Sequence, residues 1–258
     1  MVTYPEIGEK FCRLLIGIIT GRQVDNVKVI PQKVYYGGET DRHGIRLDVC
    51  IEEEDSPSGN DSASVGTVYD IEPDKDSSSR MRKALPRRVR YYRAKIDGKG
   101  LGIGESYSKL KNTVIIMILP YDPFGRDRML YTVQNTCVEE PDIPYQDGAK
   151  TLFLYTKGKK GNPPKELRQL LTYMEETTEE NAENGTLKEL QKMVETVKRD
   201  EEVSYKYMKV FEREQMLREE GREEERENTL REKKRADDLE EKLKFLQEKY
   251  EEIQKQRV

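Results

Sequence analysis

Residues 45–49 read IRLDV and residues 68–75 read VYDIEPDK, and these two short runs decide how the chain folds. Both are rich in residues that favour β-strands, and each carries a carboxylate, Asp48 in the first and Glu72 in the second. Burying such a charge is costly unless something compensates it. Two such strands paired side by side would bring Asp48 and Glu72 together, and like charges that close favour a cation between them. A hard divalent ion with oxygen ligands is the usual one, so the runs outline a metal-dependent phosphodiesterase site.

The composition predicts one core domain with an extension. Of the 258 residues, 37% are charged and only 34% are hydrophobic, so much of the chain lies outside a core. The net charge of -4 averages regions of opposite sign. Cys12, Cys50 and Cys137 are widely spaced in apolar surroundings, which is typical of reduced, mostly buried thiols. Since there is neither a signal peptide nor an apolar run of about 18 residues, we expect a soluble cytoplasmic protein without a membrane partner.

Hydrophobic periodicity predicts an α/β domain over residues 1–160. It indicates helices over 5–19 and 80–96, and strands over 27–36, 43–52, 65–73, 113–119, 129–137 and 151–156. The run TVIIMIL at 113–119 is apolar on both faces, as a central strand would be. The polar stretch 53–64 joins the Asp48 strand to the Glu72 strand as a hairpin loop.

The rest of the chain is predicted to be helical. Residues 161–200 form a segment with helices at 165–174 and 186–199, and residues 201–258 form one long, highly charged helix. Near its end, apolar residues are spaced alternately three and four apart at Ala236, Leu239, Leu243, Leu246, Tyr250 and Ile253. This coiled-coil seam spans under three heptads, so we expect modest self-association, as a homodimer through the C-terminal helix.

A series of motifs in the first domain resembles a known family. In order they are GIRLDV (44–49), VYDIEPDK (68–75), LPRRVRYYRAKIDGKGLGIGESYSKL (85–110), YDPFG (121–125), YTVQNTC (131–137) and YQDGAKTLFLYTKG (145–158). Together they resemble the PD-(D/E)xK nuclease-family transposases, also called recombination-promoting nucleases. The resemblance implies a restriction-endonuclease-like mixed sheet flanked by helices, a divalent metal, and DNA cleavage associated with recombination or transposition.

The candidate active site consists of four residues. Asp48 and Glu72 can bind Mg²⁺ or Mn²⁺, and the backbone carbonyl of Pro73 can add a third ligand. Lys75 is the candidate that orients the attacking water or stabilises the transition state. The resemblance matches Asp48 to the family's first-strand aspartate and Glu72 to the acidic residue of its (D/E)xK element.

The chain departs from the family pattern in two places. The position two after Glu72 is Asp74 rather than Lys or Gln, and Lys75 follows one residue later. On a strand that offset points a side chain to the opposite face, unless the strand ends or bulges after Pro73. The family's acidic-aromatic-lysine motif ahead of the first helix has only Glu9 as a weak substitute here.

The stretch 80–93, RMRKALPRRVRYYR, holds the densest positive charge of the chain. It would attract the phosphate backbone of DNA and make binding strongly dependent on salt, without reading base sequence. The candidate DNA contacts are Arg80, Arg82, Lys83, Arg87, Arg88, Arg90, Tyr91 and Arg93. Alternatively, the helix is merely solvated and balances the acidic loop before it.

Three functions are compatible with these observations. The first is a Mg²⁺-dependent DNA endonuclease. The second is a degenerate relative that binds nucleic acid or a partner protein without cutting. The third is a coiled-coil adaptor with the α/β domain as its scaffold. His43 is the single histidine and stands beside Asp41, which is typical of a turn, so histidine-based catalysis is not expected.

Overall fold

The computed structural model describes residues 4, 7–24, 27–35, 45–53 and 65–255. The chain divides into two compact units, Met1–Val197 and Lys198–Val258. His43 and nearly all of the predicted loop at 53–64 lie outside the described residues.

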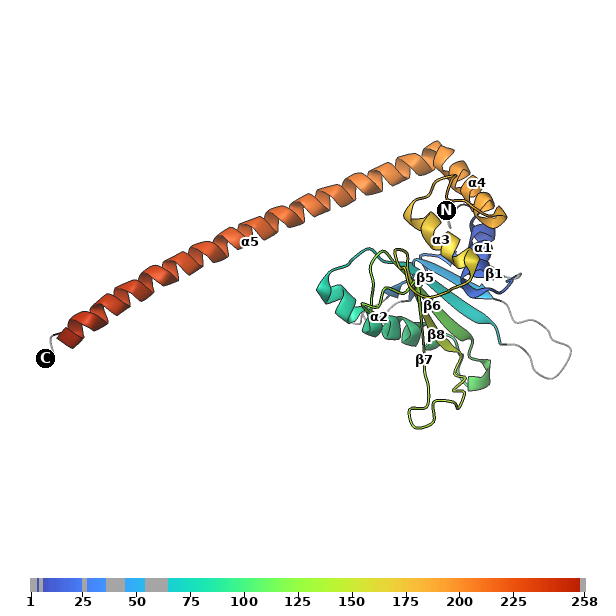
Figure 1. The fold of residues 1–258 in the computed structure, drawn as a ribbon, viewed down its shortest axis with the longest axis horizontal. Helices are drawn as coiled ribbons and strands as arrows, with labels where there is room; N and C mark the ends of the chain where they lie inside the picture. Colours follow the sequence, from blue (N-terminus) through green and yellow to red (C-terminus); the bar gives the residue numbers. More distant parts are fainter. Residues whose placement is uncertain (1–3, 5–6, 25–26, 36–44, 54–64, 256–258) are drawn as a thin grey trace. The chain divides into compact units, whose positions relative to one another are not determined.

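The first unit contains a mixed sheet of six strands in the order β1-β4-β5-β6-β8-β7 (Figure 1). The strands are β1 (Val27–Pro31), β4 (Val49–Glu53), β5 (Thr67–Pro73), β6 (Asn112–Leu119), β7 (Leu130–Gln134) and β8 (Ala149–Tyr155). The pairs β5–β6 and β6–β8 are parallel and the remaining pairs are antiparallel. Because β6 lies inside the sheet and is buried on both faces, the prediction of a central strand at 113–119 is confirmed.

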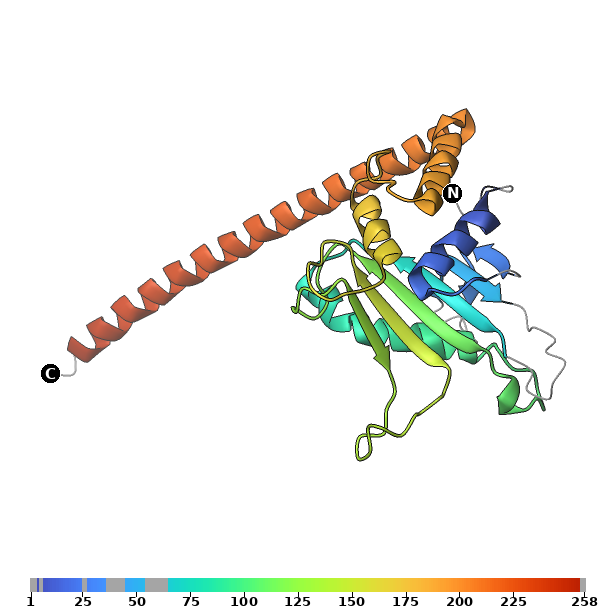
Figure 2. The same cartoon turned by 45° about the vertical axis from the view of Figure 1, so that its right-hand side comes forward.

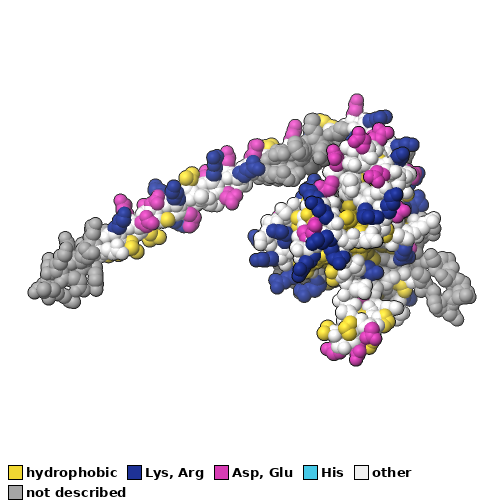
Figure 3. Space-filling view, in the orientation of Figure 1, with side chains coloured by type: hydrophobic (Ala, Val, Ile, Leu, Met, Phe, Trp, Pro, Cys, Tyr) yellow, Lys and Arg dark blue, Asp and Glu magenta, His cyan; other side chains and the backbone are white. Residues whose placement is uncertain are grey.

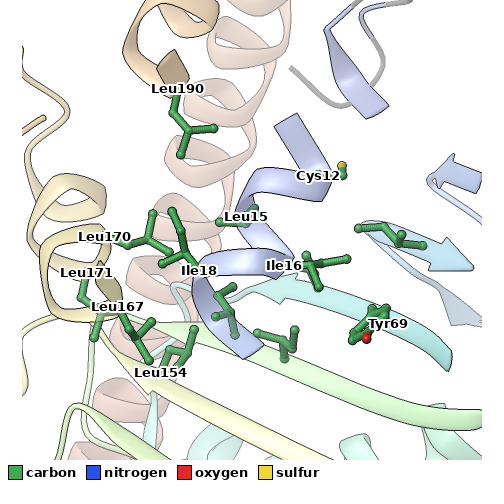
Figure 4. Close-up of a cluster of buried hydrophobic side chains, with 14 of the residues drawn as sticks. Cys12, Leu15, Ile16, Ile18, Tyr69, Leu154, Leu167, Leu170, Leu171 and Leu190 are labelled. Atoms are coloured by element: carbon green, nitrogen blue, oxygen red, sulfur yellow. The ribbon is translucent and has the colours of Figure 1, made fainter. Parts of the chain in front are cut away.

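Helices cover both faces of the sheet, which gives an α/β fold (Figure 2). On one face α1 (Gly8–Thr20) and α3 (Lys165–Glu175) pack over Tyr69 and Leu154, as the close-up in Figure 4 shows. On the other face α2 (Ser79–Asp97) packs Leu85 and Val89 against Met117 of β6. The two faces of β5 therefore have different helices as neighbours.

Two of the predicted strands are interrupted. The strand predicted at 27–36 ends at Pro31, because Gln32 has a positive φ of 52° that turns the chain out of the sheet. The next residues form β2 (Val34–Tyr35), which pairs with β3 (Ile45–Arg46) in a separate two-stranded sheet. The strand predicted at 43–52 is likewise split into β3 and β4, and Asp48 lies at a bend between them.

The segment predicted at 161–200 packs into the first unit. Its helices α3 and α4 (Gly185–Arg199) bury Leu167, Leu170, Leu187 and Leu190 in the same core as α1. An ion pair between Lys10 and Glu189 also connects α1 to α4. The unit therefore continues beyond residue 160 to Val197, since the apolar faces of these two helices have the α1 core as their partner.

The second unit is dominated by α5 (Glu201–Lys255), a single helix of 55 residues. Lys, Arg, Asp and Glu alternate along it (Figure 3), and every side chain from 219 to 244 is exposed. Such a helix is supported by its own neighbouring charges more than by burial. No helix among the described residues is long and apolar enough to cross a membrane.

Candidate active site

The pairing of β4 with β5 brings the two predicted metal ligands together. The strands are antiparallel, with Val49 opposite Ile71 and Cys50 opposite Asp70, so Asp48 lies opposite Glu72. The backbone N–H of Asp48 donates a hydrogen bond of 2.8 Å to Oε1 of Glu72. The expected proximity of Asp48 and Glu72 is thus present, although Asp48 is exposed at the bend while Glu72 is buried.

A third carboxylate, Asp70, belongs to the same group and was missed in the sequence. Because side chains alternate along a strand, Asp70, Glu72 and Asp74 share the face of β5 that α2 covers. Asp70 is 0% exposed and Glu72 is 6% exposed. Neither carboxylate oxygen of Asp70 has a hydrogen-bond donor among the described residues. The signal that could have found Asp70 is its two-residue spacing from Glu72.

Burial and mutual repulsion favour the protonated forms of this pair. Burial raises the pKa of Asp70 to about 9, and the negative charge of Glu72 adds to the increase. Burial also raises the pKa of Glu72 to about 7, against the opposing effect of the Asp48 N–H bond. When Asp70 is protonated, its O–H faces Glu72 and can donate a hydrogen bond to it. The protonated Asp70 then has a hydrogen-bond partner. The group therefore requires either a proton or a cation.

An arginine from α2 supplies the positive charge next to these carboxylates. Nη2 of Arg88 donates to Oδ2 of Asp74 at 2.6 Å, and both side chains are mostly buried. The hydroxyl of Tyr121 donates to the same oxygen at 3.5 Å. The charge of Arg88 also acts on Asp48 and Glu72, where it opposes the increase in their pKa. Arg88 was predicted as a DNA contact, but the structure places it toward the acidic face.

Lys75 lies apart from this arrangement. The N–H of Asp74 donates to the carbonyl of Ile118 in the last bond between β5 and β6, and the register up to Pro73 has no bulge. Asp74 therefore takes the place, two residues after Glu72, that the motif lysine would occupy. Lys75 is exposed and has no hydrogen bond or ion pair with any residue that the structure describes.

The remaining basic residues of α2 fall into two groups. Arg80, Arg82, Lys83, Arg87 and Arg90 are exposed, and within the described ranges none forms an ion pair. Figure 3 shows dark-blue Lys and Arg side chains gathered over the region of α2. Arg93 instead ties α2 to β8, because its Nη2 donates to the carbonyl of Lys150 and to Oγ1 of Thr151. Tyr91 is 36% exposed, and Nζ of Lys95 lies 5.4 Å from its ring centroid.

The oxygen atoms at this face suit a hard divalent cation. The described residues contain no group of three or more His, Cys, Asp or Glu already arranged as a metal site. Mg²⁺ does not require one, because it keeps several waters and is commonly held by one or two carboxylates. Asp48, Glu72 and the Pro73 carbonyl can supply ligands, and the unpartnered oxygens of Asp70 favour positive charge nearby. These residues fit the metal that the sequence motifs imply.

Comparison of the chain with protein-family models, with curated proteins and with solved structures finds no match. The grounds for a function are therefore the motifs in the sequence and the geometry of this site. Both draw attention to the same place, the face of β5 beneath α2.

Proposed function

We propose that the chain is a divalent-metal-dependent DNA endonuclease of the PD-(D/E)xK transposase family, with a restriction-endonuclease-like core. The observation that carries the proposal is the burial of Asp70 and Glu72 side by side, with Asp48 across the strand pair, beneath a basic helix. Folding alone does not require two buried carboxylates side by side. Carboxylates with pKa values shifted in this way are typical of functional sites.

In this proposal Asp48 and Glu72 hold Mg²⁺ or Mn²⁺, with the Pro73 carbonyl as a further ligand. The ion, when bound, lowers the pKa of a water and neutralises charge on the scissile phosphate. The hydrogen bond from the Asp48 N–H fixes one oxygen of Glu72, so the carboxylate is oriented before any ligand arrives. Protonated Asp70 donates to Glu72 and is a positioning residue for that carboxylate.

Arg88 is better placed than Lys75 to stabilise charge at the transition state. Its guanidinium already faces the acidic group and is oriented by Asp74, whereas Lys75 is exposed. Arginine stays protonated at any working pH, so it acts as a fixed positive charge and not as the base that activates water. The five exposed basic residues of α2 then provide phosphate contacts beside the site.

Plasmid cleavage with Mg²⁺ or Mn²⁺ tests the proposal directly. We expect nicking by the native chain, loss of at least a hundredfold in rate on Asp48→Ala and on Glu72→Gln, and little change on Asp142→Ala, a matched exposed carboxylate. Arg88→Lys should reduce the rate more than Lys75→Ala does. Equal cleavage by the native chain and Glu72→Gln would identify a contaminating nuclease and overturn the assignment.

The second candidate is a relative that binds nucleic acid and does not cut it. Asp74 favours this function, because it stands where the family has Lys or Gln and it neutralises Arg88. The same experiment distinguishes the two functions. Salt-sensitive DNA binding without cleavage under either metal would support the binding protein and refute the nuclease.

A further inference from the structure

The end of α5 carries a row of exposed leucines on an otherwise charged helix. Leu239, Leu243 and Leu246 are 65%, 59% and 64% exposed, and Ala236 precedes them on the same side. The spacing of three, four and three residues keeps all four along one stripe. Single exposed leucines are ordinary on a protein surface, but a continuous stripe at heptad spacing indicates an interaction surface.

The charges that flank the stripe indicate what covers it. When Ala236 and Leu243 are assigned to heptad position a, Arg235 is at position g and Glu240 is at position e. In two parallel, in-register helices each g residue meets the e residue five positions later on the other helix. Arg235 of each copy then faces Glu240 of the other, which gives two attractive pairs.

The antiparallel arrangement is disfavoured by the same positions. There g residues face g residues, so that Lys242 of each copy would meet position 249 of the other, which is also a lysine. This arrangement has two repulsive pairs and leaves Glu240 opposite the neutral Gln247. We propose that the stripe binds the same stripe of a second copy of this chain, in a parallel, in-register two-stranded coiled coil.

The ion pair that Arg235 makes within its own helix does not prevent this contact. Its Nη1 lies 3.5 Å from Oε1 of Glu232, and both side chains are at least 70% exposed. Exposed pairs of this kind contribute little, so Arg235 is free to exchange partners. The seam is short, and we therefore expect a dimer that dissociates in the micromolar range.

A parallel coiled coil has a consequence for the first unit. The N-terminal ends of the two α5 helices lie at the same end of the coiled coil, so both copies of Met1–Val197 are attached at that end. The dimer itself does not depend on the proposed nuclease function. If that function holds, the dimer carries two active sites.

Sedimentation equilibrium of the full chain tests the dimer. We expect mass to rise from monomer to dimer with concentration in the native chain, and Leu243→Glu to raise the Kd at least a hundredfold. Leu230→Glu is the matched control, because Leu230 is 66% exposed on the same helix but lies off the stripe. A native chain that stays monomeric at several hundred micromolar, or forms trimers, would overturn the proposal, as would an equal effect of both variants.

Charge reversal tests the orientation. In the parallel dimer Arg235→Glu turns two attractions into repulsions and should raise the Kd about tenfold, while Glu240→Arg in the same chain restores it. In the parallel dimer Lys242 faces the neutral Gln247 of the other copy. Lys242→Glu should therefore change the Kd by no more than about twofold. The opposite pattern, no effect of Arg235→Glu and tighter association with Lys242→Glu, would establish an antiparallel pair and refute the parallel one.

Discussion

The two faces of β5 are equally buried and chemically opposite. On the α1 side Tyr69 and Ile71 are 1% and 2% exposed and pack among aliphatic side chains. On the α2 side Asp70 and Glu72 are 0% and 6% exposed and have each other as neighbours. One strand therefore carries a core face and an acidic face at the same depth.

The contrast shows which face folding alone explains. Burying Tyr69 and Ile71 stabilises the protein through the hydrophobic effect, and no further reason for their presence is required. Burying Asp70 and Glu72 opposes folding unless a proton or a cation compensates them. The other buried residues described in the sheet are uncharged. An unfavourable burial of charge within such a sheet is expected at a functional site.

Breaking the apolar face should have the largest effect on stability. Ile71→Asp places a third carboxylate on β5 where neither a cation nor a donor is available, so we expect a loss on the order of 4 kcal/mol or more. Urea-induced unfolding followed by circular dichroism measures this loss. Ile71→Val, which keeps the face apolar, should lose only about 1 kcal/mol. A stable Ile71→Asp protein would mean that the two faces do not differ as described.

The acidic face should give the metal-free protein an unusual pH dependence. The pKa values of Asp70 and Glu72 are higher in the folded chain than their ordinary values, so the folded state binds more protons. Stability from this source is present below about pH 4 and is lost as the pH rises through about 7 and 9. We expect the free energy of unfolding in chelator to fall by several kcal/mol between pH 5 and pH 9.

Asp70→Asn is the control for this pH dependence, because the amide has nearly the same shape and no charge. Its unfolding curve should be flatter than that of the native chain and should lie above it at pH 8. Parallel curves for the two proteins would show that Asp70 is not the group responsible.

Removing the cation beside the acidic face should cost less. Arg88→Gln leaves Asp74 without its charge partner, and because both side chains are mostly buried we expect a loss of about 1–3 kcal/mol. Thermal unfolding at pH 7 measures it, with Arg87→Gln as the neighbouring control. Arg87 is exposed, so that substitution should stay within about 0.5 kcal/mol. Equal losses would indicate a general effect on α2 instead of a specific ion pair.

The outer side of α2 should affect DNA and hardly affect stability. Replacing Arg87 and Arg90 by alanine should lower DNA affinity and reduce the slope of log K against log salt by about 2. Fluorescence anisotropy across a salt series measures this slope. The control removes two exposed lysines, Lys188 and Lys192, from α4, a helix whose apolar side packs with the α1 core instead of α2. Similar slopes for the two double variants would show that α2 is not the DNA contact.

Local patterns predicted most of the fold. The central strand, the helix that follows β5 and the pairing of Asp48 with Glu72 follow from periodicity and from the expected hairpin between two consecutive strands. The break at Gln32 was not predicted, because glutamine rarely adopts the positive φ that it has here. The docking of α3 on α1 depends on tertiary packing, although the spacing of Leu167, Leu170 and Leu171 was consistent with it.

Only part of the candidate site could be predicted from the sequence. Strand alternation identifies Asp70 and Asp74 as neighbours of Glu72 once the strand is known, so that part was accessible. The position of Arg88 could not be predicted. It depends on how α2 crosses the sheet, which brings Arg88 to Asp74, 14 residues earlier in the chain. Lys75 was expected to reach the site if the strand ended or bulged after Pro73. The strand β5 does end at Pro73, yet Lys75 is exposed and Asp74, paired with Arg88, lies at the acidic face instead.

The bond between Asp74 and Arg88 has a consequence for how this sequence can diverge. A change of Asp74 to lysine alone would place two cations at one buried position, and a change of Arg88 alone would leave an unpaired carboxylate. Each single step is unfavourable, whereas the exchange of both residues is not. Positions 74 and 88 should therefore vary together among descendants of this chain, and a lineage with a lysine at 74 should have a neutral or acidic residue at 88.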